Sequence, residues 1–287
     1  MNKPIVLVTG KNGQLGNELQ LLAPHFPHYH FEFTDVEELD ITDKKKVDIF
    51  FAENKPVACI NAAAYTAVDK AETDRELSMK INAESVGILA QNCNQIGARL
   101  IHISTDYVFD GTANEPYNED YPVNPVNYYG LTKLKGEEKA IEHNSSSIII
   151  RTSWVYSFFG NNFVKTMIRL MKEREVVNVV SDQYGSPTYA ADLAEVIMKI
   201  VFFADAPAGI YNYSNEGNIS WFDFANEIKN IAGLTCIINP VDTAGYPTPA
   251  KRPAYSVLSK EKIISTFDIK TIPWQISLKK CIDLLSQ

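Results

Sequence analysis

A glycine-rich segment at the start of the chain restricts the fold more than any other feature. The sequence VLVTGKNGQLG places Gly10, Gly13 and Gly16 after the apolar run 5–9 and at the start of an amphipathic stretch at 14–23. Glycine adopts backbone dihedrals that other residues avoid, and it lets another group approach the main chain closely. The segment therefore predicts a strand, a tight turn and a helix, which is how a parallel α/β sheet commonly begins.

The first half of the chain continues this alternation of strand-like and helix-like segments. We expect further strands at 30–34, 57–62, 99–104 and 147–151, and helices at 44–53, 75–95 and 128–142. The strands are mostly apolar, which is typical of a sheet that is covered on both faces. The pattern predicts an α/β fold with a doubly wound parallel sheet.

The second half is less regular and predicts a smaller α/β lobe. Helical periodicity returns at 162–172, 191–203 and 221–231, while 181–189 and 242–255 are rich in Pro, Gly and Tyr and are expected to be ordered loops. Such loops often carry substrate contacts. We predict a nucleotide-binding domain at 1–157, completed by segments near 176–204, and a substrate-binding lobe at 158–287 that is interleaved with it.

Composition excludes several classes of function. The net charge of −8 argues against a nucleic-acid surface, which would need a basic face. No apolar run is long enough to span a membrane. No secretory signal is visible at the N-terminus. The scattered cysteines Cys59, Cys93, Cys236 and Cys281 favour free thiols over a disulfide or zinc site, and so a cytoplasmic protein without a metal.

The glycine segment also predicts a bound dinucleotide. A helix N-terminus offers free N–H groups and a favourable dipole to a pyrophosphate, although a glycine-rich turn without a ligand would look similar. Asp35 follows the second strand, where a carboxylate can bind a ribose 2′-OH and favour NADH. Lys11 could instead attract a 2′-phosphate and favour NADPH, so both cofactors stay open. The small residues that end the third strand leave room for the nicotinamide half, and we predict cofactor contacts from Ala62, Ala63, Ala64 and Tyr65.

Two further motifs predict proton-transfer chemistry. The segment HISTDYVFDG ends the fourth strand with Thr105 and Asp106, at the edge where ligands bind in open α/β sheets. The segment YYGLTK sets Tyr129 and Lys133 four residues apart, on one face of a helix. We expect the lysine to lower the phenol pKa from its usual value of about 10. Tyr128 is a competing phenol, but it lies on a different helix face.

These motifs resemble those of one family. GKNGQLG, INAAAYTAVDKAE, HISTDYVFDG, YYGLTK, RTSWVY, NNFVKTM, DQYGSPT and YPTPAKRP together resemble the dTDP-4-dehydrorhamnose reductases, within the extended short-chain dehydrogenases, over nearly the whole chain. The resemblance implies a Rossmann-type sheet and a nucleotide-sugar substrate, and it allows a homodimer. It implies that Thr105, Tyr129 and Lys133 are catalytic, and that Asn82 supports the lysine through water, unless Asn82 is only a polar residue on the helix surface. It implies cofactor contacts from Gly10, Lys11, Asn12, Gly13, Gln14, Leu15, Asp40, Ile41, Tyr129 and Lys133.

The same resemblance assigns the substrate side. Trp154 would pack against the sugar, although a tryptophan after a strand is often a core residue. Arg252 is our candidate for the substrate pyrophosphate, because a guanidinium binds phosphate oxygens bidentately; the alternative is a surface-loop arginine. Further substrate contacts are expected from Thr105, Asp106, Asn162 and Gln183, and with less weight from Asn161.

Some related proteins suggest alternatives. Certain relatives bind a divalent cation between subunits through carboxylates; Glu18 matches one such position, but Ala191 stands where another carboxylate is needed, so we expect no metal. A non-catalytic dinucleotide-binding protein, like the regulatory subunit of methionine adenosyltransferase, is one alternative function. A reductase or epimerase of another nucleotide-4-ketosugar is the other.

Overall fold

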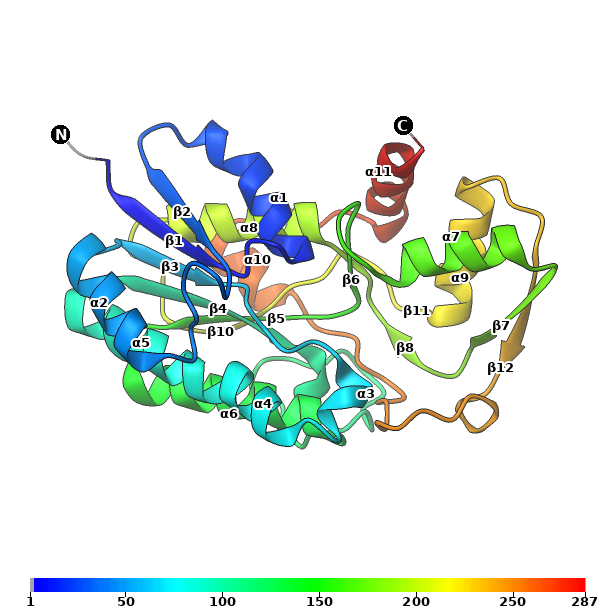
Figure 1. Ribbon diagram of the computed structural model, residues 1–287. Coiled ribbons are helices and arrows are strands. Elements are labelled where there is room, and N and C mark those ends of the chain that lie inside the picture. The colour runs from blue at the N-terminus through cyan, green and yellow to red at the C-terminus, as the bar shows by residue number, and fades with distance from the viewer. Residues whose placement is uncertain (1–2, 287) are drawn as a thin grey trace.

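A six-stranded parallel sheet forms the larger part of the molecule (Figure 1). The computed structural model describes residues 3–286. The strand order is β10-β5-β4-β3-β1-β2. The strands are β1 (Ile5–Thr9), β2 (His30–Thr34), β3 (Ala58–Asn61), β4 (Arg99–Thr105), β5 (Ile148–Thr152) and β10 (Gly209–Asn212). The predicted parallel α/β sheet is confirmed.

Helices cover both faces of this sheet because successive side chains of a strand point to opposite sides. Val6 and Val8 pack towards α1 (Gln14–Leu22), α8 (Ala190–Val201) and α10 (Glu261–Phe267). Leu7, between them, packs towards α2 (Lys44–Asn54) and α5 (Ser85–Ile96). The helix α6 (Tyr128–His143) lies beside α5 on this second face (Figure 1).

The segment after β3 is interrupted, unlike the single predicted helix at 75–95. It consists of α3 (Val68–Ala71), α4 (Arg75–Met79), the π-helical turn η2 (Lys80–Glu84) and α5. Such π-turns are frequent at functional sites. Short 3₁₀ turns occur at η1 (Ala23–His25), η3 (Asp106–Val108) and η4 (Thr243–Gly245).

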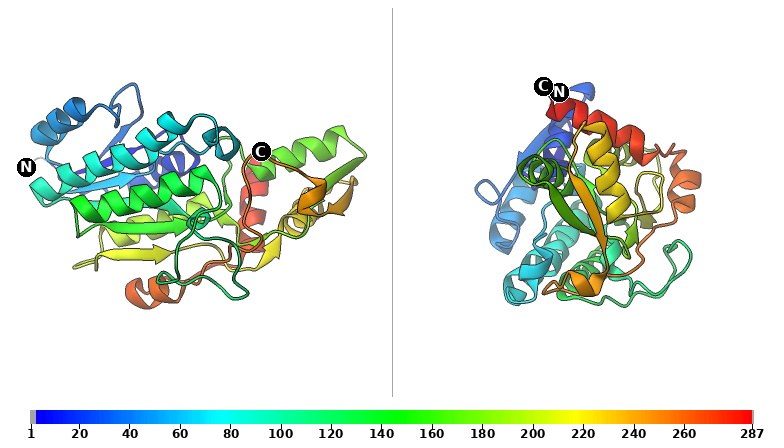
Figure 2. Two further views of the ribbon diagram at one scale, coloured as in Figure 1. Left: turned by 90° about the horizontal axis from the view of Figure 1, so that it is seen from below. Right: turned by 90° about the vertical axis from the view of Figure 1, so that its right-hand side faces the viewer.

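A smaller lobe lies beyond one end of the sheet (Figures 1 and 2). Its apolar core is formed by α7 (Phe163–Glu173), α9 (Trp221–Ile231) and α11 (Trp274–Leu285). Three strand pairs complete it: β7 (Val176–Val180) with β12 (Ile237–Val241), β6 (Val155–Tyr156) with β9 (Thr188–Tyr189), and β8 (Tyr184–Gly185) with β11 (Ile219–Ser220). The expected loop at 181–189 therefore contains two short strands.

The chain passes between the two parts more than once. Of the segments at 176–204 that were expected to complete the larger domain, α8 packs on its sheet, whereas β7 pairs with β12 in the smaller lobe. The edge strand β10, at residues 209–212, pairs with β5 and was not predicted. Within residues 3–286, no helix combines the length and the apolar character needed to cross a membrane.

Candidate functional site

A cavity of about 720 Å³ opens at the carboxyl ends of β1, β3 and β4. The chain runs from β1 to β2 on one side and returns to β3 on the other, and open α/β sheets bind ligands at this kind of reversal. The cavity brings together most predicted site residues: Gly10, Asn12, Gly13, Gln14, Leu15, Asp35, Asp40, Ile41, Ala62, Ala63, Ala64, Thr105, Asp106, Tyr129, Lys133 and Trp154. Lys11, Tyr65, Asn162, Gln183 and Arg252 do not line it.

The glycine loop is shaped by close main-chain approaches. Gly10 has φ 75°, and a Cβ there would lie 2.7 Å from the Ala63 nitrogen. A Cβ on Gly16 would clash with the Gly10 carbonyl oxygen. These approaches bring the N-terminus of α1 to the cavity, where its first N–H groups have no intrahelical partners. The loop therefore fits an anionic group such as a pyrophosphate.

Asp35 and Lys11, the two residues expected to bear on the choice of cofactor, lie in different settings. Asp35 Oδ2 accepts a hydrogen bond from the Asn12 N–H at 3.2 Å, and it lines the cavity. Lys11 Nζ lies 2.5 Å from Glu38 Oε1, a partner that sequence reasoning missed. This hydrogen bond raises the pKa of Lys11. Lys11 is therefore already paired with a carboxylate, whereas Asp35 faces the cavity.

Asp40 forms a local turn and also faces the cavity. Its Oδ1 accepts from the Thr42 N–H at 2.9 Å and from the Thr42 hydroxyl at 2.7 Å, which makes an Asx-type turn before α2. Asp40 and Ile41 also line the cavity. The turn thus presents both residues to the cavity.

Tyr129 is brought to Thr105 by the close packing of α6. The Asn127 side chain caps α6 by accepting from the Gly130 N–H at 2.8 Å, and a Cβ on Gly130 would clash with the Tyr107 carbonyl. The rings of Tyr107 and Tyr129 meet edge to face, 5.8 Å apart. Burial raises the pKa of Tyr129 to about 12, although the Thr105 hydroxyl partly opposes this.

Lys133 is buried and points at strand β4. Its Nζ donates to the Ile103 carbonyl at 2.6 Å and lies 3.4 Å from His102 Nε2. Burial lowers the pKa of Lys133 to about 8, against the influence of Glu137. The expectation that the phenol pKa falls below its usual value is wrong for this structure, because burial raises the pKa of Tyr129 and Lys133 Nζ donates to the Ile103 carbonyl.

Asn82 lies in η2 and contacts α6 directly through Thr132. Its Oδ1 accepts from the Tyr65 N–H at 2.8 Å, and its Nδ2 donates to the Tyr65 carbonyl and to Thr132 Oγ1, both at 3.0 Å. Asn82 is buried, so it is not a polar residue of the helix surface. The Tyr65 phenol donates to Asp74 Oδ2 at 2.6 Å, so its side chain is engaged away from the cavity.

Trp154 was expected to be either a sugar contact or a core residue, and it both faces the cavity and packs against another aromatic ring. It lines the cavity, and it stacks on Trp221 with ring centroids 3.5 Å apart. Its φ of 48° lies in the left-handed region, and a Cβ on Gly185 would come within 2.5 Å of its ring. Trp221, which also lines the cavity, was missed because nothing local to the sequence separates it from a core residue.

Arg252 is held by Asp69 rather than pointing into the cavity. Its guanidinium makes a bidentate pair with that carboxylate, with N–O distances of 2.5 and 3.0 Å, and its Nη1 donates to the Ala250 carbonyl at 2.6 Å. The hydrogen bond from Arg252 lowers the pKa of Asp69. The side chain is 19% exposed and lies in a loop, paired with Asp69.

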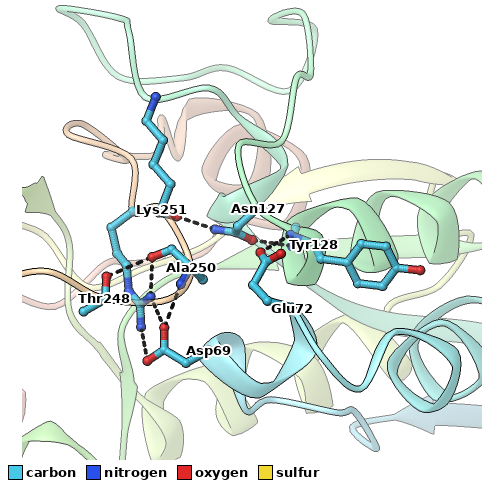
Figure 3. A network of polar contacts seen from close by, with 9 residues as sticks. Asp69, Glu72, Asn127, Tyr128, Thr248, Ala250 and Lys251 are labelled. Atoms are coloured by element: carbon cyan, nitrogen blue, oxygen red, sulfur yellow. Dashed lines mark hydrogen bonds and ion pairs between the residues drawn. The ribbon is translucent and has the colours of Figure 1, made fainter.

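The segment 248–252, which we call the strap, is thereby fixed against α3 and the start of α6 (Figure 3). The Ala250 N–H donates to Asp69 Oδ1 at 3.1 Å, and Asn127 Nδ2 donates to the Lys251 carbonyl at 2.8 Å. The Lys251 side chain extends away from this network (Figure 3). The strap is thus tied to the N-terminus of α6.

The remaining predicted substrate residues have mostly structural contacts. Gln183 donates to Thr243 Oγ1 at 3.0 Å. Asn162 caps α7 by accepting from the Lys165 N–H at 3.1 Å, and it donates to Gln14 Oε1 at 2.9 Å. Its neighbour Asn161, another expected substrate contact, lines the cavity.

Two buried carboxyl groups have raised pKa values. Burial raises the pKa of Asp106 to about 7, partly offset by the Ser256 and Thr105 hydroxyls. Burial also raises the pKa of Glu18, which accepts from the Ser157 hydroxyl at 2.6 Å. Within residues 3–286, no three His, Cys, Asp or Glu side chains are grouped in a way that could hold a metal ion.

Comparison with known proteins gives one consistent result. Residues 3–287 match the family model described as RmlD substrate binding domain. A dTDP-4-dehydrorhamnose reductase of Aggregatibacter actinomycetemcomitans is 40% identical over 284 residues, which cover 96% of this chain and 97% of the relative.

Solved structures agree with this result. A dTDP-4-dehydrorhamnose reductase of Clostridium acetobutylicum is 45% identical, with a TM-score of 0.94, over 99% of this chain and 100% of the other. One of Bacillus anthracis, in complex with NADP, is 41% identical, with a TM-score of 0.93, over 98% and 99% of the two chains. The chain therefore belongs to the dTDP-4-dehydrorhamnose reductase family, whose members are NAD(P)-dependent oxidoreductases.

Proposed function

We propose that this chain reduces the C4 ketone of dTDP-4-dehydro-6-deoxy-L-mannose to give dTDP-L-rhamnose, a precursor of cell-surface polysaccharide, with NADPH or NADH as the reductant. The observation that carries this proposal is that Thr105, Tyr129 and Lys133 line the same cavity as the glycine loop. One cavity thus combines a dinucleotide-type loop with a proton donor. Membership of the reductase family supports the choice of substrate.

The protein residues would manage the proton. A bound nicotinamide supplies the hydride that reaches C4. Tyr129 donates its phenol proton to the C4 oxygen, and its pKa of about 12 keeps it protonated at neutral pH. Thr105 orients the ketone oxygen through its hydroxyl. Lys133, one helical turn after Tyr129, supplies positive charge that stabilises the phenolate left behind.

The cofactor side of the proposal rests on the main chain. The N-terminus of α1 and the loop 10–15 would hold the pyrophosphate, and Asp35 would bond the ribose. Asp40 and Ile41 would flank the adenine. Lys11 would reach a 2′-phosphate only by leaving Glu38, so we propose that both NADH and NADPH are accepted.

The substrate side of the proposal uses residues from both parts of the chain. Trp154 and Asp106 line the cavity and would contact the sugar. Arg252 would bind the substrate pyrophosphate after exchanging its partner Asp69, because both the carboxylate and the phosphate oxygens accept the same pair of N–H groups. Asn162 and Gln183 would make further contacts at the edge of the substrate site.

A direct assay tests this function. Purified protein is mixed with dTDP-4-dehydro-6-deoxy-L-mannose and either NADPH or NADH, and both cofactor oxidation and dTDP-L-rhamnose are measured. We expect one mole of cofactor oxidised per mole of product. Binding without turnover would support a regulatory dinucleotide-binding protein instead, and isomerised sugar without net oxidation would support an epimerase. A UDP-linked ketosugar serves as the control for the nucleotide.

We also propose the organisation in which the protein works. Residues 1–157 would form the main part of the nucleotide-binding domain and 158–287 mainly the substrate lobe, with a cytoplasmic location and assembly as a homodimer. The four buried free cysteines support a reducing compartment. Light scattering of the purified protein at several concentrations tests the dimer.

A further inference from the structure

A buried chain of polar side chains connects strand β1 to the catalytic lysine. Thr9 Oγ1 donates to Asn61 Oδ1 at 2.7 Å, Asn61 Nδ2 lies 3.1 Å from His102 Nδ1, and His102 Nε2 lies 3.4 Å from Lys133 Nζ. Each of these residues is at most 2% exposed. They come from the neighbouring strands β1, β3 and β4 and from helix α6, so the chain crosses the sheet beneath the cavity.

The direction of these hydrogen bonds is set at the Thr9 end. Thr9 Oγ1 accepts from the Ala63 N–H at 3.4 Å and donates its own proton to Asn61 Oδ1 at 2.7 Å. The amide nitrogen of Asn61 must then face His102 and donate to Nδ1. Burial, together with the Lys133 charge, lowers the pKa of His102 well below its usual range, so the ring carries one proton. That proton lies on Nε2.

An Nε2–H group that faces Lys133 favours one form of the lysine. A neutral amine has a lone pair that can accept this N–H, whereas an ammonium has none. The charged form would be accommodated only if the ring proton moved to Nδ1, the Asn61 amide turned over, and Thr9 changed from donor to acceptor. Protonation of Lys133 is therefore coupled to reversal of the hydrogen bonds that run from Thr9 through Asn61 to His102.

The other groups around Lys133 do not remove this preference. The Ile103 carbonyl accepts from Nζ at 2.6 Å. Glu137, one turn along α6, favours the charged form, but its carboxylate is shared with Arg151, at 2.7 and 2.9 Å, and with the Ser104 hydroxyl. Among the described residues, η2 packs against the same helix and presents the neutral Asn82. Tyr129 lies on the preceding turn of α6.

We propose that His102 is a positioning residue whose Nε2–H, oriented by Thr9 and Asn61, sets the protonation state of Lys133. The inference rests on the proposed role of Lys133 in reduction. A charged Lys133 is the active form, because a cation near Tyr129 favours loss of the phenol proton. The direction of these hydrogen bonds then limits activity at alkaline pH. Because Thr9 is the last residue of β1, this limit is linked to the strand that precedes the glycine loop.

The test compares pH profiles of kcat/KM across three variants. In the wild-type enzyme the alkaline limb should lie near the Lys133 pKa of about 8. His102→Gln can turn a carbonyl oxygen towards the ammonium, so its limb should move to higher pH by about one unit, a tenfold change in the ionisation constant. Thr9→Val removes the hydroxyl that orients Asn61, although Thr9 does not touch Lys133, and should move the limb in the same direction. Thr9→Ser keeps the hydroxyl and should keep the wild-type limb.

A spectroscopic measurement separates this inference from the reaction itself. Nitrogen NMR of protein labelled at histidine and lysine reports the His102 tautomer and the Lys133 titration without substrate. At a pH well above the Lys133 pKa of about 8, where the amine is neutral, we expect a protonated Nε2 and an unprotonated Nδ1, and protonation of the lysine should move the ring proton to Nδ1. An Nδ1–H tautomer beside the neutral amine, an imidazolium, or His102→Gln activity that falls at every pH without movement of the limb or of the Lys133 titration would overturn the proposal. Absence of wild-type turnover with the ketosugar would overturn the proposed function, while leaving the tautomer result interpretable.

Discussion

The cofactor side and the substrate side of the cavity are built in different ways. On the cofactor side, the main chain of the glycine loop approaches the main chain after β3, and the residues involved lie within short motifs. On the substrate side, side chains from distant segments hold one another: Arg252 is 183 positions from Asp69, and Trp154 stacks on Trp221. The first side is therefore set by local backbone geometry, and the second by long-range contacts that a ligand can rearrange.

The largest effect is expected at Tyr129, where the two sides meet. Tyr129→Phe removes the proposed proton donor and should reduce kcat by about 10³-fold, within the usual range for general acid catalysis. The Kd for NADPH should stay within a factor of about three, because the cofactor side is formed by main chain. Tyr128→Phe is the matched control, since its ring packs under the Arg75 guanidinium instead. Near-normal turnover of Tyr129→Phe would refute the donor role.

Asp106, also between the two sides, should make stability depend on pH. Its folded pKa of about 7 lies above its usual value, so the folded state holds the proton more tightly than the unfolded chain does. Stability should therefore fall as pH rises from about 4 to about 7, by up to roughly 4 kcal/mol. Asp106→Asn should remove this loss and be more stable than the wild type at pH 8, as measured by urea unfolding at pH 5 and 8.

Asp110 provides a control with the opposite sign. The Thr112 N–H and hydroxyl lower the pKa of Asp110, so its contribution is present above its unfolded pKa and is lost as pH falls. Asp110→Asn should therefore be less stable than the wild type near neutral pH. If both variants changed stability in the same direction at pH 8, the assignment at Asp106 would be wrong.

Gly16→Ala tests the cofactor side alone. The added Cβ would clash with the Gly10 carbonyl, and overpacking of this kind costs about 1–3 kcal/mol. We expect weaker NADPH binding, by tenfold or more, and a lower Tm. Leu21→Ala, at an exposed position of α1, is the control. Unchanged NADPH binding in Gly16→Ala would show that the glycine loop tolerates a side chain, against the geometry described.

The smallest effect is expected for Arg252→Ala, on the substrate side. Loss of a charged hydrogen-bond donor should raise KM for the nucleotide sugar about tenfold with little change in kcat. Lys251→Ala is the matched control, because the network uses only the main-chain carbonyl of Lys251 (Figure 3). A fall in kcat at constant KM would contradict the pyrophosphate assignment.

Sequence reasoning succeeded where a rule connects neighbouring residues. The alternation of strands and helices, the glycine loop and the spacing of Tyr129 and Lys133 all follow from local periodicity, and the structure contains each of them. It did not identify the partners of Arg252 and of Lys133 Nζ in this structure, Asp69 and the Ile103 carbonyl, because these contacts depend on how distant segments pack. The interruption at η2 was missed because KINAES continues an acceptable helical pattern, while its π-turn is imposed by contacts with Tyr65 and α6.

The late position of β10 has a consequence for how the protein is made. During synthesis, β1 to β5 leave the ribosome before residues 209–212 exist, so the β5 edge of the sheet has unpaired main-chain groups for that interval. By then α7, β7 and α8 of the intervening chain have already emerged. The larger domain therefore cannot finish folding as an independent first step, and a nascent chain stopped before β10 presents an open edge on which aggregation or chaperone binding can begin.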